Sequence, residues 1–93
     1  MNLPVDYDSL KAHEKKPVRD EYVRIQKGRC YFCDMPLSGK ACKSILSLPI
    51  DLRFFPPNFL KYPVHLHHSH DTGKTLGAVH SYCNAVLWQY KGE

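Results

Sequence analysis

Histidines that suit metal binding and acid–base chemistry crowd one segment of this chain. Five of its six histidines lie between residues 65 and 80, and the run from His67 to Cys83 is followed at once by Asn84. Imidazole is the most frequent metal ligand and the usual general base near neutral pH. One of two adjacent histidines can bind a divalent metal while the other accepts a proton from water, and the Asn84 carbonyl oxygen can complete the metal site. Phosphodiester hydrolysis needs little more than such a base and a cation on the phosphate.

A second group of metal ligands is interleaved with these histidines. Two residues separate Cys30 from Cys33, and two separate His80 from Cys83. Each pair can reach one ion from a tight turn, and together they form a closed tetrahedral set, which is typical of structural zinc. The 46 residues between Cys33 and His80 mean that the ion would join distant segments. Cys42 competes for the fourth position, but it has no partner at the same spacing and is better interpreted as a buried or free thiol.

Composition limits the kind of protein that this chain can be. Its 93 residues suffice for one domain with a modest core, so a metal or disulfide crosslink is expected. The first ten residues do not resemble a secretory signal, and no apolar run approaches the length of a membrane span. We therefore expect an intracellular protein of a reducing compartment, the cytoplasm or the nucleus, with no membrane partner and with its cysteines on zinc.

Positive charge is concentrated in the first half of the chain. The formal net charge is +4, and nine of the 13 Lys and Arg residues lie between Lys11 and Lys43, together with four acidic residues. A basic segment beside a histidine-rich site suits a polyanion partner. On charge alone, an ordinary solvated surface is the simpler interpretation.

The first half predicts an arm, a helix and a long loop. Residues 1–16 show no clear periodicity and are expected to form a loose arm or a short helix, ahead of a single domain over residues 17–93. Apolar residues at helical spacing predict a helix that begins at Pro17 and ends at Gly28. The prolines of residues 37–63 exclude long regular elements there. The residues expected to pack this loop onto the core are Phe54, Phe55, Phe59 and Leu60.

The second half predicts a hairpin followed by a helix. Short strands are expected at residues 64–68 and 76–80, joined through a turn at residues 71–74. Residues 81–90 then have the pattern of a helix. Because it alternates with apolar neighbours, His65 is expected to be an exposed strand residue without a role. The elements together predict an α+β fold.

The order of these motifs resembles the HNH, or His-Me finger, nucleases, particularly the group around recombination endonuclease VII. That family has Cys-x2-Cys, then Asp-His-x-His, then Thr-Gly-Lys-x-x-Gly, and finally Cys-x2-Cys-Asn. The matching residues here are Gln26-Lys27-Gly28-Arg29, Cys30 and Cys33, His67-His68-Ser69-His70, Thr72-Gly73-Lys74-Thr75-Leu76-Gly77, and His80-Ser81-Tyr82-Cys83-Asn84. The match covers residues 22–35 and 64–90, roughly half of the chain.

The resemblance implies a small zinc-stabilised ββα-metal domain with assigned roles for its residues. His68 would be the general base, and His67 and Asn84 would bind the catalytic divalent metal. His70 would lie near the scissile phosphate or the leaving group. A structural zinc ion would be held by Cys30, Cys33, His80 and Cys83. The residues in or beside these motifs that are expected to contact DNA are Lys27, Arg29 and Lys74.

Three positions differ from the family pattern. His67 stands where the family has Asp, although the colicin-type branch also has adjacent histidines. His80 replaces a zinc cysteine, and Leu76 stands where many relatives have Arg. With imidazole in place of a carboxylate, the catalytic ion can be Mg²⁺, Mn²⁺, Ni²⁺, Co²⁺ or Zn²⁺.

The pattern as a whole predicts a metal-dependent DNA endonuclease that hydrolyses phosphodiester bonds with a water activated by His68. The alternative is a catalytically inactive HNH-like domain that binds DNA or acts as an accessory module. The sequence leaves open whether the chain forms a homodimer or works with a larger DNA-processing partner.

Overall fold

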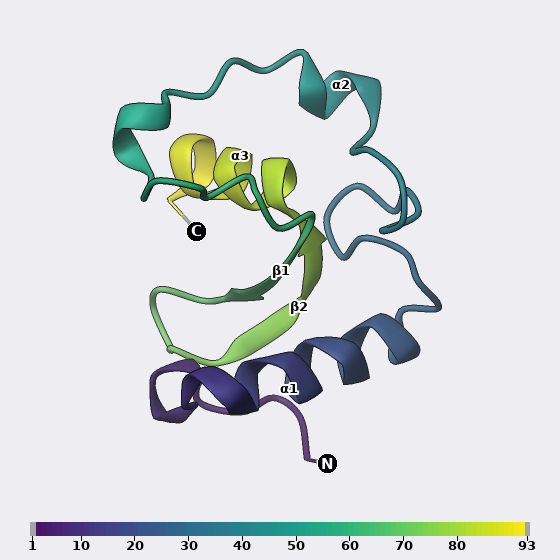
Figure 1. The fold of residues 1–93 in the computed structure, drawn as a ribbon, viewed down its shortest axis with the longest axis vertical. Coiled ribbons are helices and arrows are strands. Elements are labelled where there is room, and N and C mark those ends of the chain that lie inside the picture. Colours follow the sequence, from purple (N-terminus) through teal and green to yellow (C-terminus); the bar gives the residue numbers. More distant parts are fainter. Residues whose placement is uncertain (1, 93) are drawn as a thin grey trace.

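A two-stranded antiparallel hairpin lies between two helices at the centre of the molecule (Figure 1). The structure is a computed structural model that describes residues 2–92. Its helices and strands are α1 (Ala12–Ile25), α2 (Lys43–Leu46), β1 (Val64–His68), β2 (Thr75–His80) and α3 (Ser81–Lys91), with short 3-10 turns at Tyr7–Ser9 and Leu52–Phe54. α1 packs along one side of the hairpin, and α3 continues directly from β2. The α+β class is confirmed.

The hairpin agrees closely with its prediction. β1 covers the predicted residues, and β2 begins one residue before the predicted start. The antiparallel pairing has one register shift, between His67 and His68. Neighbouring side chains of a strand normally point to opposite faces, and such a shift re-aims one of them. In the turn, Gly73 has φ +75°, a conformation that glycine adopts without strain.

The first helix begins earlier than predicted. α1 starts at Ala12, so the predicted start at Pro17 is wrong, and Pro17 lies inside the helix. A side-chain oxygen of Glu14 accepts a hydrogen bond from the backbone N–H of Lys11 at 2.9 Å. This bond caps the N-terminus of α1. The cap and the burial of Tyr22 against the hairpin compensate for the hydrogen bond that the proline removes.

The segment before α1 is tied to the hairpin. The N–H of Val5 donates to Oγ1 of Thr75 at 3.0 Å, and the N–H of Thr75 donates to the Val5 carbonyl at 2.9 Å. The N–H of Tyr7 donates to the Gly73 carbonyl at 2.8 Å. These bonds give the segment a defined place, with Tyr7 beside the turn of the hairpin.

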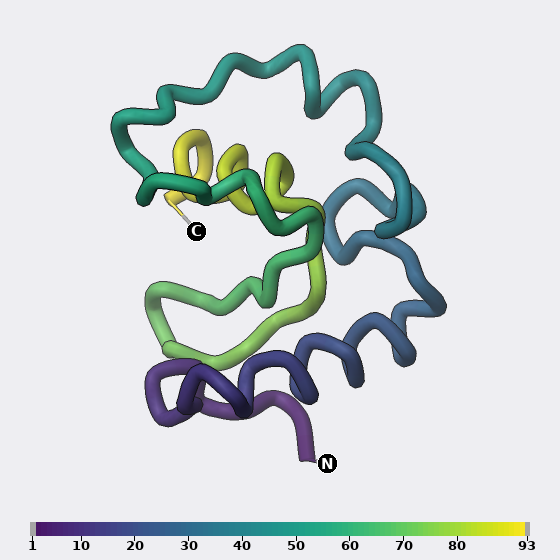
Figure 2. Tube along the Cα trace, in the orientation of Figure 1, coloured from purple at the N-terminus to yellow at the C-terminus, as the bar shows by residue number. Residues whose placement is uncertain are grey.

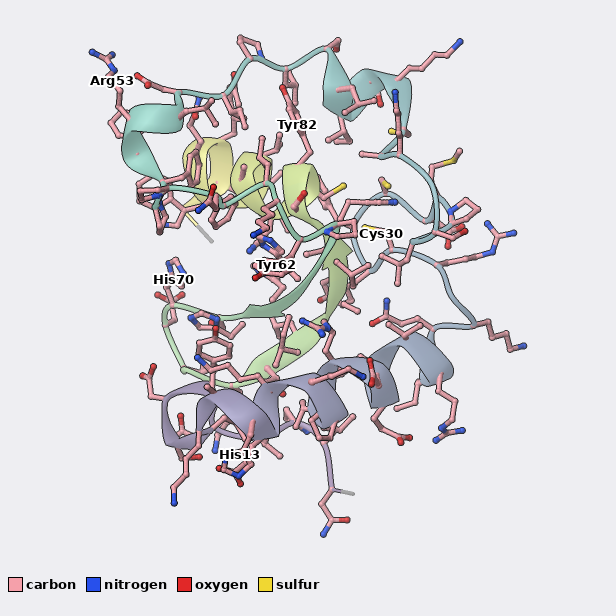
Figure 3. The ribbon with its side chains drawn as sticks, viewed as in Figure 1. His13, Cys30, Arg53, Tyr62, His70 and Tyr82 are labelled. Atoms are coloured by element: carbon pink, nitrogen blue, oxygen red, sulfur yellow. The ribbon has the colours of Figure 1, made fainter. Side chains whose placement is uncertain are left out.

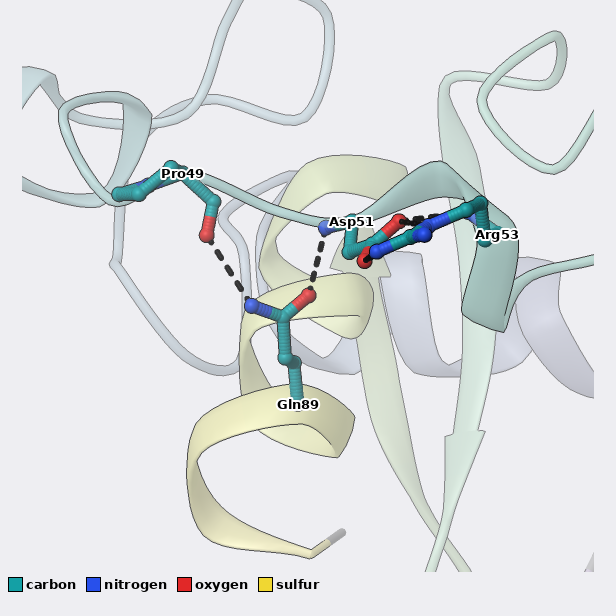
Figure 4. A network of polar contacts seen from close by, with 4 residues as sticks. All are labelled: Pro49, Asp51, Arg53 and Gln89. Carbon is teal, nitrogen blue, oxygen red and sulfur yellow. Dashed lines mark hydrogen bonds and ion pairs between the residues drawn. The ribbon is translucent and has the colours of Figure 1, made fainter.

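The long loop of residues 37–63 arches over α3 before it enters β1, as Figure 2 shows. Gln89 of α3 holds the loop at two points, since its Oε1 accepts from the Asp51 N–H at 2.8 Å and its Nε2 donates to the Pro49 carbonyl at 3.2 Å (Figure 4). Asp51 also pairs with Arg53, with 2.7 Å between Oδ2 and Nη2. Bonds from α3 thus position a loop that has little secondary structure of its own.

The aromatic side chains of this loop pack differently from the prediction. Phe54 and Leu60 are exposed, and Phe55 and Phe59 are half-buried. Instead of entering the core, the phenylalanine rings gather against Trp88 of α3 and His65 of β1. They form one wall of a cleft.

Gln26, which directly follows α1, bonds to β2 in the manner of a neighbouring strand. Its Oε1 accepts from the Ala78 N–H at 2.8 Å, and its Nε2 donates to the Ala78 carbonyl at 2.9 Å. Gly77 precedes Ala78 in β2. A Cβ atom at position 77 would come within 2.8 Å of both Gln26 Oε1 and the Tyr31 ring. This close approach explains why glycine stands at the end of the Thr-Gly-Lys-x-x-Gly motif.

Gly77→Ala is expected to destabilise the fold by about 1–3 kcal/mol, since the added methyl group overpacks a tight contact. The matched control is Gly39→Ala, where the nearest atom to a new Cβ is the Pro36 carbonyl oxygen at 3.8 Å. That change should stay within about 0.5 kcal/mol. Urea unfolding of both variants measures the difference, and equal stability of the two would contradict the packing described at Gly77.

Candidate metal sites and the histidine cleft

The four predicted zinc ligands lie together where β2 meets α3. Cys30, Cys33, His80 and Cys83 each offer one ligand atom, and these atoms all lie within 4.8 Å of one another. Figure 3 shows Cys30 and several sulfur atoms at one end of the hairpin and His70 at the other end. Three sulfurs and one imidazole make a donor set that fits tetrahedral zinc. The group can therefore hold a structural metal ion that joins the turn after α1 to the end of the hairpin.

A tight turn presents the two N-terminal cysteines of this group. The N–H of Cys30 donates to the Met35 carbonyl at 2.9 Å, and the N–H of Asp34 donates to the Cys30 carbonyl at 3.0 Å. Asp34 has φ 64°, which aspartate tolerates better than most residues. The N–H of Phe32 points at the Cys30 sulfur at 3.4 Å, so the turn also stabilises negative charge on that sulfur.

The orientation of the His80 ring suits a metal ligand. Its Nε2 lies 2.9 Å from the Pro36 carbonyl oxygen and donates to it. This bond leaves Nδ1 as the ring's lone-pair atom, and Nδ1 lies 3.5 Å from the Cys33 sulfur and 3.6 Å from the Cys83 sulfur. A hydrogen bond from the second ring nitrogen to a carbonyl group is the usual support of a metal-binding histidine.

Two of these sulfurs, those of Cys30 and Cys83, influence each other's ionisation. A hydrogen bond with Cys83 lowers the pKa of Cys30 to about 4, and the same contact together with burial raises the pKa of Cys83. The buried sulfurs cannot all be thiolates unless a positive charge replaces the protons, and a zinc ion supplies that charge. Cys42 is not one of the four, and its sulfur lies 3.0 Å from the Ser44 hydroxyl.

The predicted ligands of the catalytic metal meet at the base of the cleft. His67 is only 2% exposed, and its Nδ1 lies 3.1 Å from Oδ1 of Asn84. His67 comes from β1, whereas Asn84 comes from the first turn of α3. The hairpin and the helix that follows it thus bring together two residues that are 17 positions apart.

His65 also belongs to this cluster and is half-buried, so the prediction that it is an exposed strand residue is wrong. Its Nδ1 lies 3.2 Å from Nδ2 of Asn84, and its ring packs edge-on against Phe59 with 4.7 Å between centroids. Burial lowers the pKa of His65, which favours the neutral ring that accepts a hydrogen bond from the amide. With its amide nitrogen held by His65, Asn84 turns its oxygen towards His67.

His68, the predicted general base, lies next to the pair. Its ring stacks on Tyr7 with 3.9 Å between centroids and 10° between planes. The centroid of the His70 ring lies 5.1 Å from that of the His68 ring. Burial and the neighbouring histidines, His70 before His67, lower the pKa of His68, so the neutral form predominates near pH 7.

These histidines line a cleft of about 470 Å³. Lys15 and Arg19, both on α1, supply the charged groups among the described residues that line it. The three predicted DNA-binding residues, Lys27, Arg29 and Lys74, lie outside this lining. Arg29 instead donates from Nη1 to the Asp34 carbonyl at 2.9 Å. Sequence reasoning therefore missed the two cations that line the cleft with the histidines, which only the packing of α1 against the hairpin identifies.

No family model, no curated protein and no solved structure matches this chain. Within residues 2–92, every helix is too short or too polar to span a membrane.

Proposed function

We propose that this protein is a metal-dependent DNA endonuclease of the HNH type, with a ββα-metal centre formed by β1, β2 and α3. The observation that carries the proposal is the approach of His67 Nδ1 to Asn84 Oδ1, 3.1 Å apart, in a cleft that His68 also lines. The residue types and their order along the chain also support a nuclease of this type. Hydrolysis of a phosphodiester by activated water is the chemistry that such a group performs best.

The His67–Asn84 pair fits a divalent metal ion. Metal–nitrogen and metal–oxygen bonds are about 2.0–2.2 Å long, so one ion that replaces the Nδ1 proton of His67 can contact both donor atoms, which lie 3.1 Å apart. When bound, the ion would neutralise charge on the scissile phosphate and the leaving oxygen. Both ligands are neutral, so we expect affinity for the ion to be low until a phosphate adds its negative charge.

His68 takes the proton of the attacking water in this proposal. Stacking on Tyr7 holds the plane of its ring, and its lowered pKa keeps a nitrogen lone pair available near neutral pH. His70 lies close enough to His68 to contact the phosphate or the leaving group. Lys15 and Arg19 then offer positive charge to the DNA backbone along the cleft.

The proposed zinc has an indirect part in this site. Asn84 directly follows Cys83, and both lie in the first turn of α3. A zinc ion that holds Cys83 and His80 therefore also fixes the end of the helix from which Asn84 reaches His67. Zinc thus stabilises the site without taking part in hydrolysis.

The second candidate is an HNH-like domain that binds DNA or a larger DNA-processing enzyme without cutting. The replacement of the family's Asp by His67 favours it, because a carboxylate ligand is lost. Nicking of supercoiled plasmid in the presence of divalent ions separates the two functions, since the second predicts binding with no strand breakage.

The metal preference is expected to follow from the imidazole ligand. Mg²⁺ prefers oxygen ligands, whereas imidazole suits Ni²⁺ and Co²⁺ better. We expect Ni²⁺, Co²⁺ or Mn²⁺ to support faster plasmid cleavage than Mg²⁺ at equal concentration, and His67→Asp to shift the preference towards Mg²⁺. Initial cleavage rates of both proteins with the four ions measure this.

The control for this series is His13→Asp, which makes the same change at an exposed position of α1. It should leave the order of the ions as in the parent protein. If the parent prefers Mg²⁺ strongly and His67→Asp does not alter that preference, His67 is not a ligand of the catalytic metal.

A further inference from the structure

Aromatic rings from two distant segments form one wall of the cleft. Residues 54–62 supply most of them, and α3 adds Trp88. The rings that line the cleft on this side are Phe54, Phe55, Phe59, Tyr62 and Trp88. The nuclease chemistry proposed above requires none of them.

Four of these rings, Phe54, Phe55, Phe59 and Trp88, form a continuous aromatic surface that reaches the candidate metal site. The centroids of Trp88 and Phe55 lie 5.4 Å apart, and those of Phe55 and Phe59 lie 4.7 Å apart. Phe59 packs against His65 at 4.7 Å, and His65 bonds to Asn84. A ligand on this surface would therefore lie next to the atoms proposed to hold the catalytic ion.

Much of this surface remains open to solvent. Phe54 is 57% exposed, Tyr62 is 62% exposed and Trp88 is 40% exposed. Aromatic rings that fill a core are mostly buried. Large aromatic groups that are exposed in a cleft indicate a surface that contacts a ligand.

The charges of the cleft indicate which ligand fits. The charged side chains among its described lining residues are Lys15 and Arg19, and both are cationic. The Lys15 ammonium lies 4.5 Å from the centroid of the Tyr7 ring, on the histidine side of the cleft. Flat apolar rings and positive charge in the same cleft are complementary to a nucleotide, whose base stacks while its phosphate meets the cations.

We propose that the aromatic wall binds an unpaired base of a DNA strand, next to the phosphate that the histidine site cleaves. Bases inside a duplex are stacked on their neighbours and cannot offer a face to Phe54 or Trp88, so the protein should prefer single-stranded or unpaired DNA to a perfect duplex. The position of the phosphate rests on the proposed function, whereas binding of the base can be measured without cleavage.

Trp88 is the only tryptophan of the chain, so its fluorescence reports on the wall directly. The zinc-loaded protein, with no other divalent metal added, is titrated with three probes of equal length: a single-stranded thymidine oligonucleotide, an abasic strand with the same phosphates, and a perfect duplex. The thymidine strand should quench Trp88 and bind about tenfold more tightly than either other probe, as base–aromatic stacking predicts.

Two variants of the same 3-10 turn provide a matched pair. Phe54 and Leu52 are 57% and 61% exposed, but only Phe54 lines the cleft. Phe54→Ser should weaken binding of the thymidine strand by about tenfold, while Leu52→Ser should leave it unchanged. Equal affinity for base-bearing and abasic strands, or equal effects of the two substitutions, would overturn the proposal. So would a dimer in sedimentation whose formation shifts the Trp88 fluorescence, because a second copy of the chain would then cover the wall.

The results also separate this inference from the nuclease proposal. Quenching by the thymidine strand with no cleavage under any added ion would keep the base site and overturn the nuclease. Cleavage together with equal binding of all three probes would keep the nuclease and overturn the base site.

Discussion

Chelation of zinc is expected to unfold this protein. Cys30 and Cys33 lie on the turn after α1, whereas His80 and Cys83 lie where β2 meets α3, so a bound ion would link two segments far apart in sequence. Apparent binding free energies of structural zinc are about 10–16 kcal/mol, which matches or exceeds the whole stability of a typical domain, about 5–15 kcal/mol. Elemental analysis should find one zinc ion per chain, and chelation should abolish the near-UV circular dichroism.

Two cysteine variants make this test specific. Cys33 and Cys42 are both half-buried, but only Cys33 belongs to the candidate zinc group. Cys33→Ser should lose zinc and tertiary structure, while Cys42→Ser should change the free energy of unfolding by no more than about 0.5 kcal/mol. A protein that keeps its fold after complete chelation would refute the structural role of the ion.

His68→Ala is expected to reduce DNA cleavage by about 10²–10⁴-fold, the usual contribution of a general base. His68 is not part of the zinc group, so zinc content should stay unchanged. The lost ring stacks on Tyr7, and such aromatic pairs are worth about 0.5–1.5 kcal/mol, so stability should fall only slightly. Plasmid cleavage rates, zinc analysis and thermal unfolding of the same preparation measure the three quantities.

His13→Ala is the control for this substitution, because His13 is an exposed histidine of α1. It should cleave at the rate of the parent protein. Should His68→Ala cleave DNA as fast as the parent, another group must activate the water, and the assignment of His68 as the base fails.

The hairpin, α3 and the zinc group could be predicted because their signals are local. Alternation, a turn with Gly73 and helical spacing mark the elements in short stretches of sequence. The Cys-x2-Cys and His-x2-Cys pairs each fit on one tight turn. The only long-range assumption was that both pairs bind the same ion.

The residues that were missed depend on long-range packing. His65 and His67 point to the same face of β1 by alternation, which was a usable signal, but the ring that packs on His65 comes from Phe59, in a loop without clear pattern. The early start of α1 depends on a cap at Lys11, which is not a usual capping residue. The contact of Tyr7 with His68 arises because the N-terminal segment pairs with the hairpin.

The central claim is that the cleft of His67, His68 and Asn84 cuts DNA with the help of a divalent ion. It is tested most directly by the rate at which the zinc-loaded protein nicks supercoiled plasmid with and without added Mn²⁺, Co²⁺, Ni²⁺ or Mg²⁺. We predict nicking that depends on the added ion and exceeds the rate of His68→Ala by at least about 100-fold. Folded, zinc-loaded protein that nicks no faster than His68→Ala with any of these ions would contradict the account.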